Sequence, residues 1–193
     1  INIDDDAMKA ICAAFGSTSG APMLHIAGHT PEASMPSAPA ADRVTIDREM
    51  LANAWRQLNS GGAKIDLVAI GSPHLSLAEL HLIDAAFDGR HCHADVKLIL
   101  TIGRDVLQIA RQDGVAGRLE ASGATLYSDL CWCSITQPLF PLETKVLMTN
   151  SGKYAHYATG LSGCRVRLGG ITACVEAAVS GIAKTALPRW LGH

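Results

Sequence analysis

The sequence predicts an α/β domain in which helices cover both faces of a parallel sheet, so that the domain has three layers. Short apolar strands alternate with helical segments from residue 65 onward, an order typical of parallel sheets. The helical segments repeat apolar residues every three or four positions. Polar loops, most of them containing glycine, follow four of the strands, and the carboxyl ends of parallel strands share one edge of the sheet.

The composition excludes several classes of protein. The chain has 193 residues, of which 48% are hydrophobic and 18% are charged, enough to form a compact core. A formal net charge of -2 does not favour nucleic acid as a partner. The longest apolar runs, such as 96–102, are far shorter than the roughly 20 residues that cross a membrane. Without a visible signal peptide or disulfide framework, we expect reduced cysteines and a cytoplasmic location.

The first 42 residues differ from the rest in pattern. Three aspartates at 4–6 precede a helix predicted over 7–15, and a short strand is predicted at 23–26. Residues 28–42 are rich in Pro, Ala and Ser and predict a long loop. We therefore divide the chain into 1–42, which complete an upstream or adjacent domain, and 43–193, which form the α/β domain. The start without Met suggests a processed chain or an excerpt of a longer protein.

The remaining elements follow in order. Apolar residues at helical spacing predict a helix over 47–58, which Gly61 and Gly62 terminate. Ser76 and Glu79 have the spacing of a capping box and fix the start of a later helix. The pattern predicts strands at 65–70, 96–102, 125–127, 146–149 and 165–168, and helices at 77–87, 105–112 and 173–183.

Four loops at strand ends contain the polar residues that could bind a ligand. They span 71–74, 101–104, 128–133 and 149–153, and in open α/β sheets a ligand binds in the crevice at that edge. The last loop and the residues after it include Thr149, Asn150, Ser151, Lys153 and His156, donors suited to a carboxylate or an oxyanion. A polar loop that caps a helix is the alternative.

Two other motifs in these loops are less specific. A phosphate loop is excluded, because Leu147 replaces its required glycine and Tyr154 replaces its Ser or Thr. His74 could carry a proton or could be an ordinary side chain near a helix cap.

Three cysteines are candidate metal ligands. Cys131 and Cys133 lie in a strand-end loop, and Cys174 lies near the start of the last helix, where the helix dipole favours a thiolate. Each could instead be a small buried hydrophobe. Their spacing is not that of a zinc finger. We expect Cys12 and Cys164 to be structural.

Five segments together resemble the aconitase X family: 17–33, 71–80, 128–133, 149–157 and 169–181. The resemblance implies an aconitase-like architecture, with a large α/β part and a small swivelling domain or subunit that closes over the site. This chain resembles the later, C-terminal portion of that large catalytic part. It implies a dehydratase that removes water from a small hydroxy acid at an iron–sulfur cluster (2Fe-2S or 4Fe-4S) held by three thiolates. Family members include bacterial cis-3-hydroxy-L-proline dehydratases and archaeal phosphomevalonate dehydratases.

The resemblance also assigns residues. Cys131 and Cys174 match family ligands, whereas Ser72 replaces a cysteine that many relatives have, so Cys133 or a cysteine outside this chain would be the third ligand. A serine on the small domain would be the base, so this chain alone should be inactive. The expected catalytic residues are Ser72, His74 and Lys153, and the expected substrate-binding residues are Ser72, His74, Arg104, Asn150, Ser151, Gly152, Lys153 and His156.

The expected reaction converts cis-3-hydroxy-L-proline to 1-pyrroline-2-carboxylate. Ser72 favours that branch of the family, and Arg104 and Lys153 are the only basic side chains at the predicted edge, few for a phosphorylated substrate. The alternatives are a phosphomevalonate dehydratase, a metal-free binding or regulatory domain with the same fold, and a zinc hydrolase. The zinc hydrolase lacks its usual sequence signatures.

Overall fold

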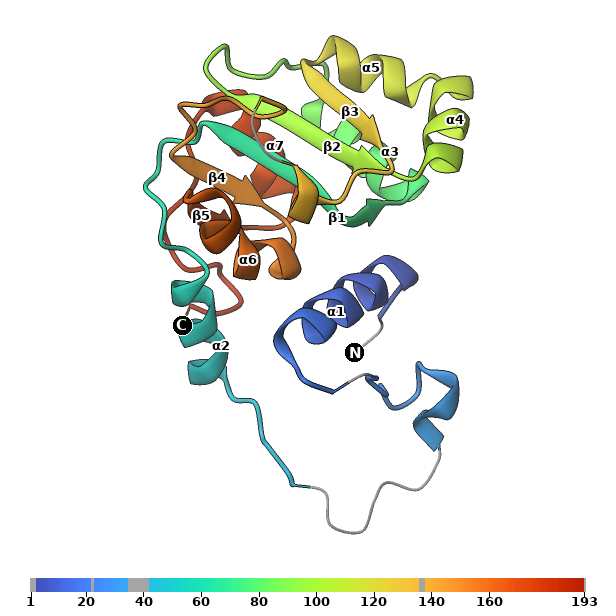
Figure 1. Ribbon diagram of the computed structural model, residues 1–193, viewed down its shortest axis with the longest axis vertical. Helices are drawn as coiled ribbons and strands as arrows, with labels where there is room; N and C mark the ends of the chain where they lie inside the picture. Colours follow the sequence, from blue (N-terminus) through green and yellow to red (C-terminus); the bar gives the residue numbers. More distant parts are fainter. Residues whose placement is uncertain (1–2, 22, 35–41, 136–137, 193) are drawn as a thin grey trace.

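A five-stranded parallel sheet forms the centre of the protein, as predicted (Figure 1). The computed structural model describes residues 3–21, 23–34, 42–135 and 138–192. The strand order is β3-β2-β1-β4-β5. The strands are β1 (Leu67–Leu75), β2 (Lys97–Ile102), β3 (Ala124–Ser128), β4 (Val146–Thr149) and β5 (Arg165–Leu168).

Helices cover both faces of the sheet, which confirms the three predicted layers. On one face, α3 (Leu77–Phe87), α4 (Arg104–Gln112), α5 (Val115–Ala121) and α7 (Ile171–Ser180) pack on alternate strand residues such as Val68 and Leu98. On the other face, α6 (Gly152–Ser162) and η2 (Trp132–Ser134) pack on Leu67 and Ile99. Because the first part of β1 is buried on both faces, residues 67–70 form a continuous apolar run instead of an alternating pattern.

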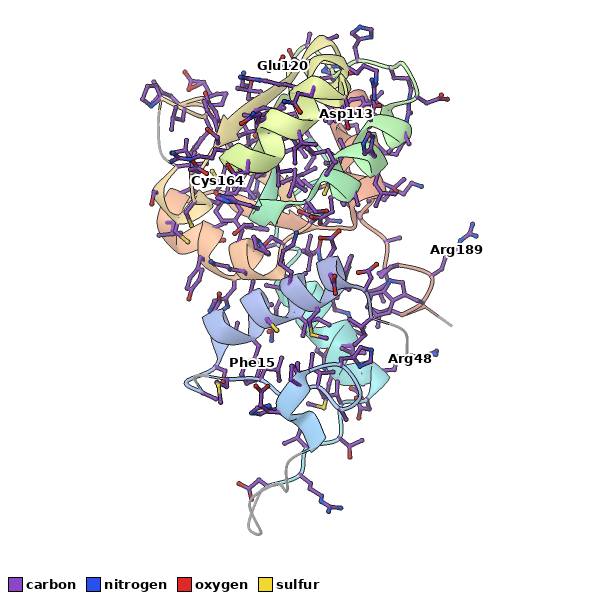
Figure 2. All side chains as sticks on the ribbon, turned by 90° about the vertical axis from the view of Figure 1, so that its right-hand side faces the viewer. Phe15, Arg48, Asp113, Glu120, Cys164 and Arg189 are labelled. Carbon is purple, nitrogen blue, oxygen red and sulfur yellow. The ribbon has the colours of Figure 1, made fainter. Side chains whose placement is uncertain are left out.

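The first third of the chain lies outside the sheet. Helix α1 (Asp5–Thr18) packs against α6 and β1, while η1 (Pro31–Ser34) and α2 (Arg48–Gln57) lie further from the sheet (Figures 1 and 2). The long loop predicted at 28–42 falls partly outside the described residues. The division of the chain at residue 42 stays a prediction.

Three local predictions were wrong. Residues 23–26 are not a strand: no strand of the described residues pairs with them, and their end turns back so that the Ile26 N–H donates to Thr30 Oγ1 at 2.9 Å. Cys12 is exposed instead of buried, because α1 covers the domain without burying any of its own residues. Helix α5, which the sequence pattern did not predict, follows α4 with only Asp113 and Gly114 between them.

The end of β1 also differs from the prediction. Residues 71–75 continue the strand instead of forming a loop, with a register shift against β2 between Ile70 and Leu75. The capping box at the start of α3 is confirmed, since Ser76 and Glu79 exchange both hydrogen bonds. Pairing with β2 and the capping box of α3 therefore fix the main chain before and after His74.

Candidate active site

The candidate site lies where the strand order reverses. Strands β1 and β4 are neighbours in the sheet, and the chain leaves them toward opposite faces, to α3 and to α6. Ligands bind outside the carboxyl ends of two such strands. Ser72 and His74 lie at that end of β1, and Asn150 to Gly152 follow β4 directly. The topology therefore brings these two predicted groups together.

A hydrogen bond joins the two strand ends. Ser151 Oγ donates to the main-chain oxygen of Ser72, and the same Oγ accepts from the Tyr154 N–H at 2.9 Å, which caps α6. A cavity of about 20 Å³ lies between them and has room for a water-sized molecule. Its lining comprises Lys9, Ala10, Ser72, Pro73, Glu79, Asn150, Ser151 and Gly152.

The side chain of Asn150 contributes a hydrogen-bond acceptor to the lining of this cavity. Its Oδ1 is buried and has no hydrogen-bond partner among the described residues. A buried polar atom without a partner costs about 1–3 kcal/mol, and the free N–H groups at the start of α6 attract anions. The wall formed by Asn150 and α6 is therefore suited to a small polar ligand that both donates and accepts hydrogen bonds.

Arg104 and Asp129 form an exposed pair just beyond the ends of β2 and β3. Arg104 donates from Nε to Asp129 Oδ2 at 2.5 Å and from its main-chain N–H to Oδ1 at 3.0 Å. The main-chain hydrogen bond from Arg104, followed by the one from its side chain, lowers the pKa of Asp129. The Arg104 guanidinium thus already has an anionic partner, and a substrate would have to share it.

The cysteine loop after β3 is anchored through its middle residue. Trp132 is buried, packs on Tyr154 with ring centroids 5.0 Å apart, and donates from Nε1 to the Ile70 oxygen at 3.4 Å. Cys131 and Cys133, on either side, are exposed, and the Cys133 N–H donates to Cys131 Sγ at 3.4 Å. The two thiols are therefore neighbours at the surface.

The surroundings of Cys133 shift the pKa of its thiol in two opposite directions. Partial burial, followed by the hydrogen bond with Cys131, raises the pKa of Cys133, while the positive charge of Lys153 opposes that rise. Lys153 thus lies near the cysteine loop. His156, in contrast, is exposed on α6 and contacts Tyr157 edge-on at 5.2 Å instead of lining the cavity.

Cys174 lies in a different environment. It is fully buried near the start of α7, with Sγ 3.8 Å from the Gly169 oxygen, and burial raises the pKa of its thiol. Among the described residues, no three His, Cys, Asp or Glu side chains are grouped so that they could hold a metal ion. Cys131 and Cys133 lie together as two exposed thiols, but the structure does not group the predicted ligand Cys174 with them. Cys174 would ionise only if a bound cation stabilised its thiolate.

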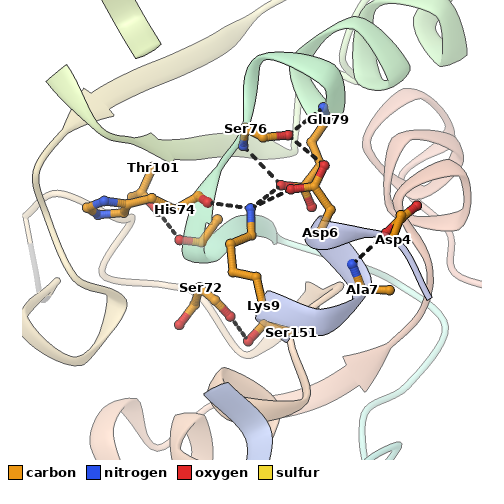
Figure 3. Close-up of polar contacts among 11 residues, drawn as sticks. Asp4, Asp6, Ala7, Lys9, Ser72, His74, Ser76, Glu79, Thr101 and Ser151 are labelled. Carbon is orange, nitrogen blue, oxygen red and sulfur yellow. Dashed lines mark hydrogen bonds and ion pairs between the residues drawn. The ribbon is translucent and has the colours of Figure 1, made fainter. Parts of the chain in front are cut away.

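Two residues of the site were missed in the sequence. Lys9 on α1 and Glu79 on α3 line the same cavity as Ser72 and are joined by an ion pair of 2.8 Å (Figure 3). They lie 70 positions apart in the chain. In the sequence, Glu79 was recognised only as part of a helix cap, and no pattern indicated a role for Lys9.

Comparison with known proteins agrees with this architecture. The model of the aconitase X third domain matches residues 65–180, and that of the aconitase X second domain matches residues 2–56. A solved structure of Thermococcus kodakaraensis aconitase X in its holo-form superposes with a TM-score of 0.79 and 25% identity, over 91% of this chain and 44% of that chain.

Curated relatives are longer than this chain. Cis-3-hydroxy-L-proline dehydratase of Pseudomonas aeruginosa is 45% identical over 98% of this chain and 34% of its own length. The enzyme of the same name from Hypocrea jecorina is 37% identical over 96% of this chain and 32% of its own length. The phosphomevalonate dehydratase large subunit of Methanothermobacter thermautotrophicus is 32% identical over 82% of this chain and 39% of its own length.

The chain thus spans about a third of the first two relatives. Because the third-domain model covers more than half of its residues, the chain belongs to the aconitase X family.

Proposed function

We propose that this chain is part of a hydro-lyase that removes water from cis-3-hydroxy-L-proline to give 1-pyrroline-2-carboxylate. The observation that carries the proposal is the 45% identity, over 98% of this chain, to a protein named for that activity. The crevice between β1 and β4 supports it, because Ser72, Asn150 and Ser151 meet there. Since the relatives are about three times longer, the remaining parts of the enzyme, including a small swivelling domain or subunit, would complete the site.

The residues of this chain would bind and orient the substrate. The first N–H groups of α6 and the side chain of Lys153 would hold the carboxylate, as a helix start favours an anion. Ser72 and His74 would face the reacting carbons from the end of β1. Asn150 Oδ1, which has no partner among the described residues, would accept a hydrogen bond from the substrate nitrogen. The base that removes the proton would be a serine of the swivelling part.

We further propose an iron–sulfur cluster as the cofactor, with Cys131 and Cys174 as ligands and Cys133 or a cysteine outside this chain as the third. When bound, such a cluster supplies a Lewis acid that assists departure of a hydroxide. The six cysteines of this chain are free thiols, which suits the cytoplasm, where thiols stay reduced. No helix among the described residues is long and apolar enough to cross a membrane.

The test uses the complete enzyme, meaning residues 1–193 together with the parts that the longer relatives contain. The enzyme is purified without oxygen, and its visible absorption, iron content and turnover of cis-3-hydroxy-L-proline are measured. Cys131→Ser and Cys174→Ser should each abolish colour and turnover. Cys12→Ser is the matched control, since this exposed thiol on α1 should leave both unchanged.

Other outcomes separate the alternatives. A colourless, iron-free wild type without turnover would support a metal-free binding domain. Stoichiometric zinc without iron would support a hydrolase. Turnover of phosphomevalonate in place of hydroxyproline would assign the activity named for the archaeal relative, which is 32% identical.

A further inference from the structure

Lys9 is the charged residue through which α1 contacts the candidate site. Its ammonium donates to Asp6 Oδ1 at 2.9 Å, to Glu79 Oε2 at 2.8 Å and to the main-chain oxygen of His74 at 2.9 Å (Figure 3). A lysine ammonium has three N–H donors. All three are used, so Lys9 has none left for a substrate even though it lines the cavity.

The acceptors around Lys9 are themselves fixed. Ser76 Oγ donates to Asp6 Oδ2 at 2.7 Å, and the Ser76 N–H donates to Glu79 Oε2 at 3.0 Å. The side chains of Lys9, Asp6 and Glu79 are only 31%, 29% and 12% exposed, so solvent ions screen their attraction less than at an open surface. The network therefore joins α1 firmly to the end of β1 and the start of α3.

The pKa values agree with a charged network. Burial alone would lower the pKa of Lys9, but its hydrogen bonds to Glu79 and Asp6 outweigh burial and raise it. Burial would raise the pKa of Asp6, but the hydrogen bonds from Lys9 and Ser76 outweigh burial and lower it. The ion pair between Lys9 and Asp6 thus persists across the neutral range.

His74 extends this network to the cysteine loop. Its Nε2 lies 2.9 Å from the main-chain oxygen of Leu130, the residue before Cys131. Because a carbonyl oxygen only accepts, Nε2 must carry the hydrogen, which leaves Nδ1 free for another partner. Lys9 holds the main chain of His74, and His74 in turn holds the loop that contains the candidate ligand Cys131.

We infer that Lys9 is a positioning residue: by holding the His74 carbonyl, it sets where the His74 ring and the Cys131 loop lie relative to the substrate crevice. Its role in turnover rests on the proposed function; its role in ordering the two segments does not. The relevant contacts are 65 and 56 positions apart in sequence. Small displacements of reacting groups cost up to about 100-fold in rate.

The test compares Lys9→Met, Lys9→Arg and wild type in the complete enzyme. Amide hydrogen exchange is followed by mass spectrometry over residues 72–76 and 128–134, and kcat and KM are measured on cis-3-hydroxy-L-proline. Lys9→Met should speed exchange in both segments about tenfold, because local opening becomes easier. It should lower kcat by about 10- to 100-fold with KM within about twofold of wild type. Lys9→Arg, which keeps the charge and several donors, should recover most of both losses.

Lys64→Met is the matched control. Lys64 is exposed beyond the amino end of β1, and its side chain makes no hydrogen bond or ion pair within the described part of the chain. It should behave as wild type. Should Lys9→Met fail to fold, Asp6→Asn removes one ionic acceptor more gently and should speed exchange in the same two segments.

Two results would overturn the inference. One is unchanged exchange in both segments, whatever happens to turnover. The other is a tenfold rise in KM with kcat unchanged, which would make Lys9 a substrate contact. If the wild type shows no dehydratase activity, the proposed function fails, and the exchange data alone still decide the role of Lys9.

Discussion

Replacing Gly71 by alanine should destabilise the domain more than a single added methyl group usually does. Gly71 has a φ of +112° at the register shift of β1. A Cβ there would meet Thr101 on β2, closely at its main-chain oxygen, at 2.5 Å from Oγ1 and at 2.9 Å from the main-chain nitrogen. Most of these are atoms of a fully buried backbone, which cannot rotate away.

The expected cost has two parts. A side chain in this region of φ costs about 1–3 kcal/mol in backbone strain, and overpacking a dense core costs about 1–3 kcal/mol more. We therefore expect the free energy of unfolding to fall by about 2–6 kcal/mol. The Thr101 Oγ1 hydrogen bond to the Gly71 oxygen, 2.6 Å long, should also be disturbed.

Equilibrium urea unfolding measures this cost, with the fluorescence of the buried Trp132 as a signal from the core. Gly160→Ala is the matched control, because a Cβ at this helical position meets nothing within 4 Å. It should stabilise the protein by about 0.5–1 kcal/mol. A Gly71→Ala variant within about 1 kcal/mol of wild type would refute the reasoning, since its strain alone should exceed that.

Three further predictions concern other parts of the molecule. Trp132→Ala should lower the free energy of unfolding by about 3–5 kcal/mol, because loss of the buried ring leaves a cavity beside Tyr154. Since this variant lacks the Trp132 fluorophore, its urea unfolding is followed by circular dichroism; a loss below about 1 kcal/mol would contradict the buried placement. Glu176→Gln should leave the urea midpoint unchanged, since its pair with Arg90 is exposed on both sides; a clear drop would show that the pair matters. Because the pKa of Asp6 is lowered in the folded state, its stabilising effect should be present above pH of about 4 and lost as pH falls through the folded value. Asp6→Asn should therefore be less stable than wild type at pH 7, and urea unfolding should show the gap closing in acid; a gap independent of pH would exclude ionisation as the cause.

The sequence by itself determined the class of fold and the edge of the sheet at which the candidate site lies. Apolar runs such as Leu98–Leu100 and the caps of the helices are local signals, because periodicity and capping depend on residues a few positions apart. Because parallel strands have their carboxyl ends at one edge of the sheet, Ser72 and Asn150 were predicted to lie at one crevice. In the structure both residues line the same cavity.

Tertiary structure alone decided which partners meet across long stretches of chain. Nothing near Lys9 in sequence indicates that it reaches the His74 carbonyl, 65 positions away. The burial of Cys174 and the exposure of Cys131 likewise depend on which elements pack over them, although both are cysteines beside predicted loops. Local patterns specify secondary structure, whereas burial and long-range hydrogen bonds depend on the packing of elements that are distant in sequence, and packing leaves no periodic signal in the chain.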